Sequence, residues 1–238
     1  MSPERRLRDA PHEARKAEFD QFSDDYQELV DQSVKASGES GEYFADYKAR
    51  FIAKRIASRP SCRILDYGCG VGLVCRSIRR QLPHARIDGF DISQRSLDRV
   101  DSALKMQGTF TSKISDLARN YDVIVLANVL HHTRPQDRQL LLCRVMELLR
   151  AEGNLVVFEH NPANPLTRRA VKSCPFDGDA ILLPPRETVG YLTQSGLQSV
   201  RLEYIVFFPR ALHWLRPLEP SLAWCPLGAQ YAVTGRAL

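Results

Sequence analysis

The residues with the clearest capacity for chemistry lie where a short apolar run enters a glycine-rich turn. The run ILDYGCGVG places Gly68, Gly70 and Gly72 at alternate positions and puts the carboxylate of Asp66 two positions before the first glycine. Glycine permits positive φ and lets a ligand approach the backbone, because no Cβ stands in the way. A helix that starts after such a turn directs its free N–H groups at the ligand. The pattern therefore predicts a ligand-binding turn.

A second carboxylate, Asp91, follows nineteen residues after Gly72, at the end of the next predicted strand. An acidic side chain at this spacing can accept hydrogen bonds from both ribose hydroxyls of a nucleoside ligand. Dinucleotide-binding turns carry the pattern G-x-G-x-x-G, whereas the glycines here run G-x-G-x-G. Asp66 in the turn would repel a pyrophosphate and attract a ligand that carries an ammonium group.

Three histidines at the ends of later predicted strands are candidates for proton chemistry. His131 and His132 follow the apolar run 121–128, and His160 follows the run 154–159. Histidine suits a general base because its ordinary pKa lies close to neutral pH. Adjacent helical residues point about 100° apart, so we expect at most one of His131 and His132 to face an acceptor. His131 is the first choice as the base, followed by His160.

The elements that must position these residues alternate between strand and helix. Apolar runs predict strands at 63–67, 86–92, 109–112, 121–128, 154–159, 199–208 and 230–237, with helical patterns between most of them. Such alternation predicts an α/β fold, a Rossmann-like, seven-stranded, mostly parallel sheet with helices on both faces. We expect residues 1–60 to form an N-terminal helical cap over the active site. Residues 61–238 would form the core, with an apolar insertion at about 207–228.

The chain resembles the class I S-adenosylmethionine-dependent methyltransferases that act on small molecules. LDYGCGVG is similar to the first motif of that family, GFDIS to its second, and ANVLHH at 127–132 to the segment after the fourth strand. The resemblance implies S-adenosylmethionine as cofactor and S-adenosylhomocysteine as product. It also implies direct in-line methyl transfer to the oxygen or nitrogen of a small-molecule acceptor such as a sugar, a lipid-linked compound or a secondary metabolite.

The resemblance also implies which residues contact the cofactor. The methionine part would lie against the backbone of Gly68, Gly70 and Gly72, the side chain of Asp66, the segment Asn128–Val129 and the N-terminal aromatic Tyr26. Asp91 would bind the ribose, and Ile92 would lie against the adenine. Many family members place an Asp after the third strand, next to the adenine amine. Ser112 or Asp116 could serve here.

The acceptor is expected beside the segment that follows the fifth strand, EHNPANPLT, which starts at Glu159. The Glu159 carboxylate, the Asn161 amide and the His132 imidazole could each form a hydrogen bond with a polar acceptor. The alternative is a rigid loop stiffened by its two prolines. Asp177 could hold an amine acceptor or cap the next element. No cluster of His, Cys and Asp has the spacing typical of metal ligands, so we expect no metal.

The composition is typical of a folded globular chain. Lys and Arg number 33 and Asp and Glu 28, which gives a net charge of +5 over 238 residues. This excludes a disordered, collagen-like or disulfide-scaffold protein, and the six scattered cysteines favour buried free thiols. The sequence contains neither an apolar run of spanning length nor the apolar core of a secretion signal, so we expect a cytoplasmic protein. The dispersed basic residues predict no nucleic-acid partner.

Three other functions stay open at this stage. A nucleic-acid or protein methyltransferase would need a contiguous basic face, and a nicotinamide-dependent oxidoreductase would need the other glycine spacing. A catalytically silent methyltransferase-like partner protein would bind the cofactor without turnover. The apolar segment 207–227 predicts a substrate lid, a dimer surface or a membrane-surface contact, so the chain is expected to be a monomer or a homodimer.

Overall fold

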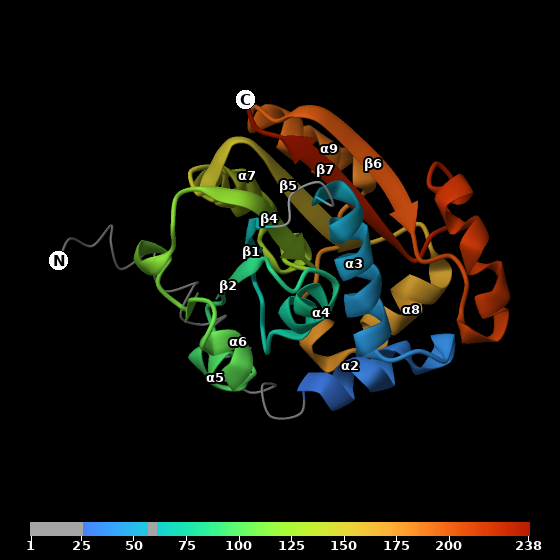
Figure 1. Ribbon diagram of the computed structural model, residues 1–238. Coiled ribbons are helices and arrows are strands. Elements are labelled where there is room, and N and C mark those ends of the chain that lie inside the picture. Colours follow the sequence, from blue (N-terminus) through green and yellow to red (C-terminus); the bar gives the residue numbers. More distant parts are fainter. Residues whose placement is uncertain (1–25, 57–60) are drawn as a thin grey trace, which may run out of the picture.

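The computed structural model describes residues 26–56 and 61–238, with the side chains of Tyr26, Gln27, Arg55, Ile56 and Phe176 outside the description. A single seven-stranded sheet runs through the molecule in the order β3-β2-β1-β4-β5-β7-β6 (Figure 1). The strands are β1 (Arg63–Tyr67), β2 (Arg86–Phe90), β3 (Phe110–Thr111), β4 (Tyr121–Ala127), β5 (Leu149–His160), β6 (Gln198–Ile205) and β7 (Gln230–Arg236). Only β7 runs antiparallel to its neighbours. The predicted Rossmann-like architecture is confirmed.

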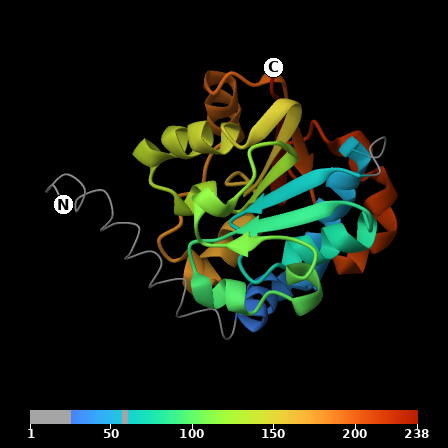
Figure 2. The same cartoon turned by 60° about the vertical axis from the view of Figure 1, so that its left-hand side comes forward.

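Helices cover both faces of the sheet, as Figure 2 shows. The longer ones are α2 (Tyr26–Val34), α3 (Gly41–Ile56), α4 (Leu73–Gln81), α7 (Pro135–Met146), α8 (Pro165–Ser173) and α9 (Pro185–Gln194). Short helices α5 (Gln94–Asp98) and α6 (Ser102–Lys105) and the 3₁₀ segments η1 (Lys35–Ser37), η2 (Ile114–Asp116), η3 (Leu130–His132), η4 (Pro175–Asp177) and η5 (Arg210–Leu222) complete the described elements. No helix within residues 26–56 and 61–238 is long and apolar enough to cross a membrane.

The alternation of side chains along the strands separates the core into two clusters. Val123 and Val125 belong to the cluster that contains α3 and α4 residues, whereas Ile124 and Leu126 belong to the cluster with α7 and α9 residues. Successive side chains of a strand point to opposite faces, so a strand buried on both faces is apolar throughout. The continuous run VIVLA in β4 has this property.

Parallel pairing brings the functional strand ends to one edge of the sheet. Asp66 on β1 pairs with Gly89 on β2 and with Val125 on β4, so the carboxyl ends of these three strands lie side by side. The residues that follow them, Asp91 and Asn128, are therefore neighbours of the glycine turn. This edge is where ligands bind in open parallel sheets.

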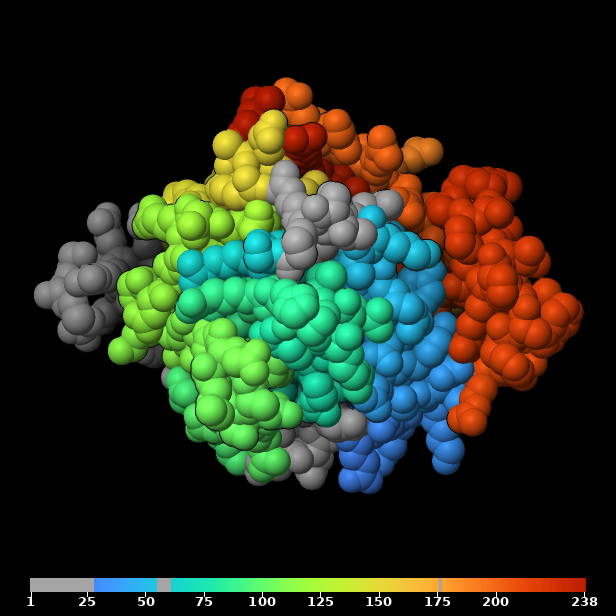
Figure 3. Space-filling view, viewed as in Figure 1, coloured from blue at the N-terminus to red at the C-terminus, as the bar shows by residue number. Residues whose placement is uncertain are grey.

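The apolar insertion forms a lobe at the side of the sheet, seen in orange-red in Figure 3. Its centre is η5, and Trp214, Trp224 and Leu227 are exposed there. The side chain of Arg216 ties the lobe to the N-terminal helices through an ion pair with Glu39 at 2.6 Å. The lobe therefore packs beside α3 instead of hanging free.

Candidate active site

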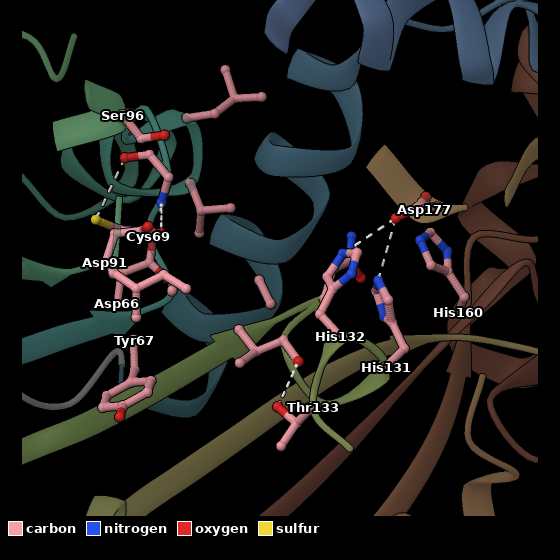
Figure 4. Close-up of a pocket in the computed structure, with 18 of the residues that line it drawn as sticks. Asp66, Tyr67, Cys69, Asp91, Ser96, His131, His132, Thr133, His160 and Asp177 are labelled. Atoms are coloured by element: carbon pink, nitrogen blue, oxygen red, sulfur yellow. Dashed lines mark hydrogen bonds and ion pairs between the residues drawn. The ribbon is translucent and has the colours of Figure 1, made fainter. Parts of the chain in front are cut away.

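A cavity of about 950 Å³ opens at the carboxyl edge of the sheet, roofed by α2 and α3. Figure 4 shows that its labelled residues fall into two groups. One group surrounds the glycine turn and Asp91, here called the cofactor end. The other contains His131, His132, His160 and Asp177, here called the acceptor end. Lys48, Phe44 and Val34 from the N-terminal helices line the same space.

The three predicted glycines all adopt positive φ, at 86° for Gly68, 51° for Gly70 and 79° for Gly72. A Cβ on Gly68 would lie 2.5 Å from Val129, whereas nothing lies within 4 Å of a Cβ on Gly70. Gly70 therefore leaves its side of the turn open to a ligand. Gly72 faces Val100 instead and does not line the cavity, which corrects the expectation that it packs against the methionine part.

Asp91 holds the glycine turn in place from the end of β2. Its Oδ2 accepts a hydrogen bond from the Gly70 N–H at 2.8 Å, and its Oδ1 accepts one from the Ser93 N–H at 2.8 Å. Asp91 and the following Ile92 both line the cavity, as predicted for the ribose and adenine contacts. The carboxylate thus has two tasks, because it fixes the loop and also faces the ligand space.

Asp66 is buried at the end of β1, with 1% of its surface exposed. The thiol of Cys75 donates to its Oδ2 at 3.2 Å, while its Oδ1 has no hydrogen-bond partner among the described residues. Burial raises the pKa of Asp66 to about 7, against the lowering effect of the Cys75 hydrogen bond. A buried carboxylate with an unused oxygen beside a cavity can accept a hydrogen bond from a ligand ammonium.

Asn128 presents a second unused acceptor to the cofactor end. It sits just after β4 at a positive φ of 61°, and its Oδ1 is buried without a partner among the described residues. Asn128 and Val129 both line the cavity, where the resemblance places the methionyl side. Unsatisfied buried acceptors, an open glycine and the Asp91 carboxylate together fit S-adenosylmethionine, which offers an ammonium group and ribose hydroxyls.

Two further predictions for the cofactor end concern the adenine contact of Ser112 or Asp116 and the role of Tyr26. Ser112 does not line the cavity, because its hydroxyl turns to Gln94 Oε1 at 3.2 Å, and Asp116 is held by Thr111. Ile114, between them, lines the cavity instead, so the structure does not support the adenine contact predicted for Ser112. The side chain of Tyr26 lies outside the described residues.

At the acceptor end, both His131 and His132 line the cavity, and the expectation that at most one of them faces an acceptor stays a prediction. Their rings lie 4.2 Å apart between centroids. Asp177 Oδ1 lies 3.5 Å from His131 Nε2 and 3.2 Å from His132 Nε2, as the dashed lines in Figure 4 show. The shared carboxylate partner draws the two side chains together, although their backbone directions diverge.

Glu159 holds the His131 ring in position through a contact with its Nδ1. It is fully buried, and its two oxygens face His131 Nδ1 at 2.5 Å and the Leu130 N–H at 2.7 Å. Burial opposes a charged imidazole, but Glu159 and Asp177 outweigh it and raise the pKa of His131 to about 9. Glu159 does not line the cavity, so its expected contact with the acceptor is corrected to a role in positioning His131.

Asn161 is likewise structural rather than acceptor-binding. Its amide donates to the carbonyl oxygens of Pro226 at 2.9 Å and Gly228 at 2.8 Å, and the residue is fully buried outside the cavity lining. It joins the loop after β5 to the end of the apolar insertion. The insertion itself contributes no residue from 207–228 to the cavity, so the expected lid is not found over the site.

His160 lies at the end of β5, with its ring centroid 5.1 Å from that of His131. It lines the cavity, and burial together with the nearby His131 lowers its pKa to about 4. Among the described residues, no hydrogen bond to its ring is found. His160 is thus a neutral imidazole that faces the acceptor space.

Lys48 is a lining residue that the sequence analysis missed. It projects from α3 and is 3% exposed, with its Nζ 5.9 Å from the Phe158 ring centroid. Burial lowers its pKa to about 8, against the opposing influence of Glu159 and Asp66. The signal in the sequence was weak, because a lysine within an amphipathic helix usually faces solvent.

Comparisons with known proteins agree with this geometry. Residues 65–155 match a family described as a methyltransferase domain. The chain is 26% identical over 218 residues to a trans-aconitate 2-methyltransferase of Mycobacterium ulcerans, covering 82% of this chain and 74% of that one. Its fold is similar to a SAM-dependent methyltransferase of Thermotoga maritima described as a possible histamine N-methyltransferase, with a TM-score of 0.64, 14% identity and 93% and 99% of the two chains covered.

A second solved structure is the CurJ carbon methyltransferase, with a TM-score of 0.61, 17% identity and 100% of this chain and 71% of that chain covered. The fold is that of the solved Rossmann-like methyltransferases. The match over residues 65–155 and the curated relatives support an S-adenosylmethionine-dependent methyltransferase.

Proposed function

We propose that this enzyme transfers a methyl group from S-adenosylmethionine to an oxygen or nitrogen of a small-molecule acceptor. The observation that carries the proposal is the continuity of one cavity from the carboxylates of the cofactor end to the imidazoles of the acceptor end. A cavity of about 950 Å³ is large enough for a cofactor together with a small acceptor.

The chain holds the cofactor by groups of complementary charge. Asp66 Oδ1 and Asn128 Oδ1 are the unused acceptors that face the methionyl ammonium, while Asp91 faces the ribose. Ile92 and Ile114 supply apolar surface for the adenine. Residues 26–56 act as a cap, since α2 and α3 close the cavity over both ends.

The acceptor end positions the nucleophile and receives its proton. S-adenosylmethionine supplies an electrophilic methyl group on a positively charged sulfur. The acceptor lone pair forms the new bond to this carbon as the carbon–sulfur bond breaks, and its electron pair stays on the sulfur of S-adenosylhomocysteine. His160, which carries no carboxylate partner among the described residues, is placed to take the acceptor proton, and Lys48 offers a cation for an anionic acceptor group.

One observation favours a second acceptor class, an activated carbon. Lys48 and three imidazoles line the same cavity, and such groups can stabilise the negative charge of an enolate. The fold is also similar to that of a protein described as a carbon methyltransferase. Proton removal from carbon would then precede methyl transfer at the same place.

The first experiment is calorimetry of the full chain with S-adenosylmethionine and S-adenosylhomocysteine. Radiolabelled methyl transfer is then measured against matched hydroxyl, amine, carboxylate and β-ketoester compounds. His160→Gln should lower kcat by about 10²–10⁴-fold if His160 is the base, whereas the exposed His84→Gln serves as the control. If the chain bound neither S-adenosylmethionine nor S-adenosylhomocysteine, the proposed methyl transfer would be excluded. Transfer to the ketoester alone would replace the oxygen or nitrogen acceptor with carbon.

A further inference from the structure

Three potential metal ligands meet at the acceptor end, although they come from distant parts of the chain. Asp177 Oδ1 lies 3.2 Å from His132 Nε2 and 3.5 Å from His131 Nε2. One ligand atom from each of the three residues lies within 4.8 Å of the other two. Figure 4 shows both imidazoles directed at the same carboxylate.

These separations match the edges of a metal coordination polyhedron. Zinc binds histidine nitrogen and carboxylate oxygen at about 2.0–2.2 Å, so two ligands of a tetrahedral site lie about 3.4 Å apart. The two N···O separations to Asp177 fall on either side of that value. Two of the three ligand–ligand distances therefore already fit a bound ion, and the ligand atoms of the two histidines lie within 4.8 Å of each other.

A second and independent observation is the state of the His131 ring. Its Nε2 is buried and has no hydrogen-bond partner among the described residues, and Asp177 Oδ1 lies 3.5 Å from it. Its Nδ1 is held by Glu159 at 2.5 Å, and Glu159 is held in turn by the Leu130 N–H. In metal sites, a histidine that binds the metal through one ring nitrogen usually donates its other ring N–H to a carboxylate, as Nδ1 of His131 does to Glu159.

We propose that His131, His132 and Asp177 bind one divalent transition-metal ion, with zinc as the reference ion. Two imidazoles and one carboxylate favour zinc, iron, cobalt or manganese over magnesium and calcium, which prefer all-oxygen sites. All three ligands line the cavity, so the remaining coordination position faces the acceptor space. The ligand for that position is an oxygen of the acceptor, or water in its absence.

The consequence for the reaction rests on the proposed function, whereas metal binding itself does not. An acceptor hydroxyl bound at the open position releases its proton more readily, and the oxygen keeps a lone pair for the methyl carbon. The proton passes to solvent or to His160. The proposal therefore narrows the acceptor to a molecule whose oxygen can coordinate a metal.

The test uses full-length protein without a histidine tag, stripped by chelator and titrated with Zn²⁺ in competition with a chromophoric chelator. We expect one equivalent to bind with micromolar or tighter affinity. His132→Ala and Asp177→Asn should each weaken it at least a hundredfold, while Glu159→Gln should weaken it by about 10–100-fold. Co²⁺ should give the visible spectrum of a four- or five-coordinate ion with nitrogen ligands.

Matched controls separate this site from chance binding. His84→Ala and His213→Ala remove exposed imidazoles, and the Cys143→Ser/Cys225→Ser double variant removes the thiols that are not fully buried. All three should keep full affinity, and circular dichroism should show every variant folded. Sub-stoichiometric binding, or equal binding by His132→Ala and the wild type, would overturn the metal site. Calorimetry with S-adenosylhomocysteine on the same samples tests the proposed function separately. Metal binding without nucleoside binding would overturn the proposed methyl transfer but not the metal site.

Discussion

The two ends of the cavity differ in how their polar groups are held. At the cofactor end, Asp91 is fixed by backbone N–H groups of adjacent turns, and Asp66 by one nearby thiol. At the acceptor end, His131 lies between two carboxylates, Glu159 and Asp177, that come from different elements. The glycine turn, Asp66 and Asp91 of the first end lie within one βαβ stretch and are held mainly by the backbone and one thiol, whereas the second end is built from side chains that depend on one another. Changes at the two ends should therefore have different kinds of effect, on affinity at one and on stability at the other.

The largest effect is expected from Glu159→Gln. Removing one partner of a buried ion pair leaves the other charge without compensation and costs about 3–5 kcal/mol. The free energy of unfolding, measured in metal-free buffer by chemical denaturation, should fall by this amount. Glu152→Gln is the matched control, because Glu152 pairs with Arg236 at 3.2 Å on the surface and should change stability by less than about 1 kcal/mol. Equal free energies of unfolding for the two variants would show that the buried Glu159–His131 pair does not stabilise the acceptor end.

The next effect belongs to the cofactor end. Asp91→Ala removes acceptors for the Gly70 and Ser93 N–H groups and for the ribose, so cofactor binding should weaken by about 1–3 kcal/mol. Calorimetry with S-adenosylhomocysteine measures this directly. Asp91→Asn keeps one acceptor oxygen and should lose less. An unchanged dissociation constant for Asp91→Ala would remove Asp91 from the cofactor site, and the contrast between the two ends would fail.

A third prediction concerns pH, and it follows from Asp66. Burial raises the pKa of this carboxyl to about 7, so it is mostly protonated and neutral below pH 7 in the cofactor-free protein. Binding a ligand ammonium requires the ionised form. Cofactor affinity should therefore fall by up to about tenfold for each pH unit below 7 and level off above it. In Asp66→Asn the same titration should be nearly flat, and parallel curves for both proteins would show that Asp66 does not pair with the ammonium.

The sequence predicts the cofactor end well because its determinants are local. The glycine spacing and the strand pattern are read within a window of about thirty residues, and Asp66, Gly68, Gly70 and Asp91 all line the cavity. Ser112 does not line it, because its hydroxyl has an alternative partner, Gln94, that the sequence does not reveal.

The acceptor end depends on tertiary packing and was predicted only in part. The sequence indicates the histidines. It does not indicate that Asp177, which lies in η4, contacts them, because no motif marks that segment. Glu159 belongs to the strand face opposite Phe158, so it turns toward His131 and away from the acceptor. Lys48 became a lining residue only because α3 packs over the sheet edge. Spacing along the chain also predicted no metal ligands, since it cannot detect a cluster assembled from two distant segments.

The smallest effect is expected at the apolar edge of the cofactor end, from Ser112→Ala. The Ser112 hydroxyl contacts Gln94 outside the cavity, so its removal should leave the dissociation constant for S-adenosylhomocysteine unchanged within twofold. Ile114→Ala makes the matched comparison, because Ile114 lines the cavity and its truncation removes apolar surface from the ligand. At about 25 cal/mol per Å² of apolar surface, that loss should weaken binding by about 1 kcal/mol or less. If Ser112→Ala weakened binding more than Ile114→Ala, the adenine would be recognised by a polar contact there, and the cofactor end would depend on a side chain outside its local turn, as the acceptor end does.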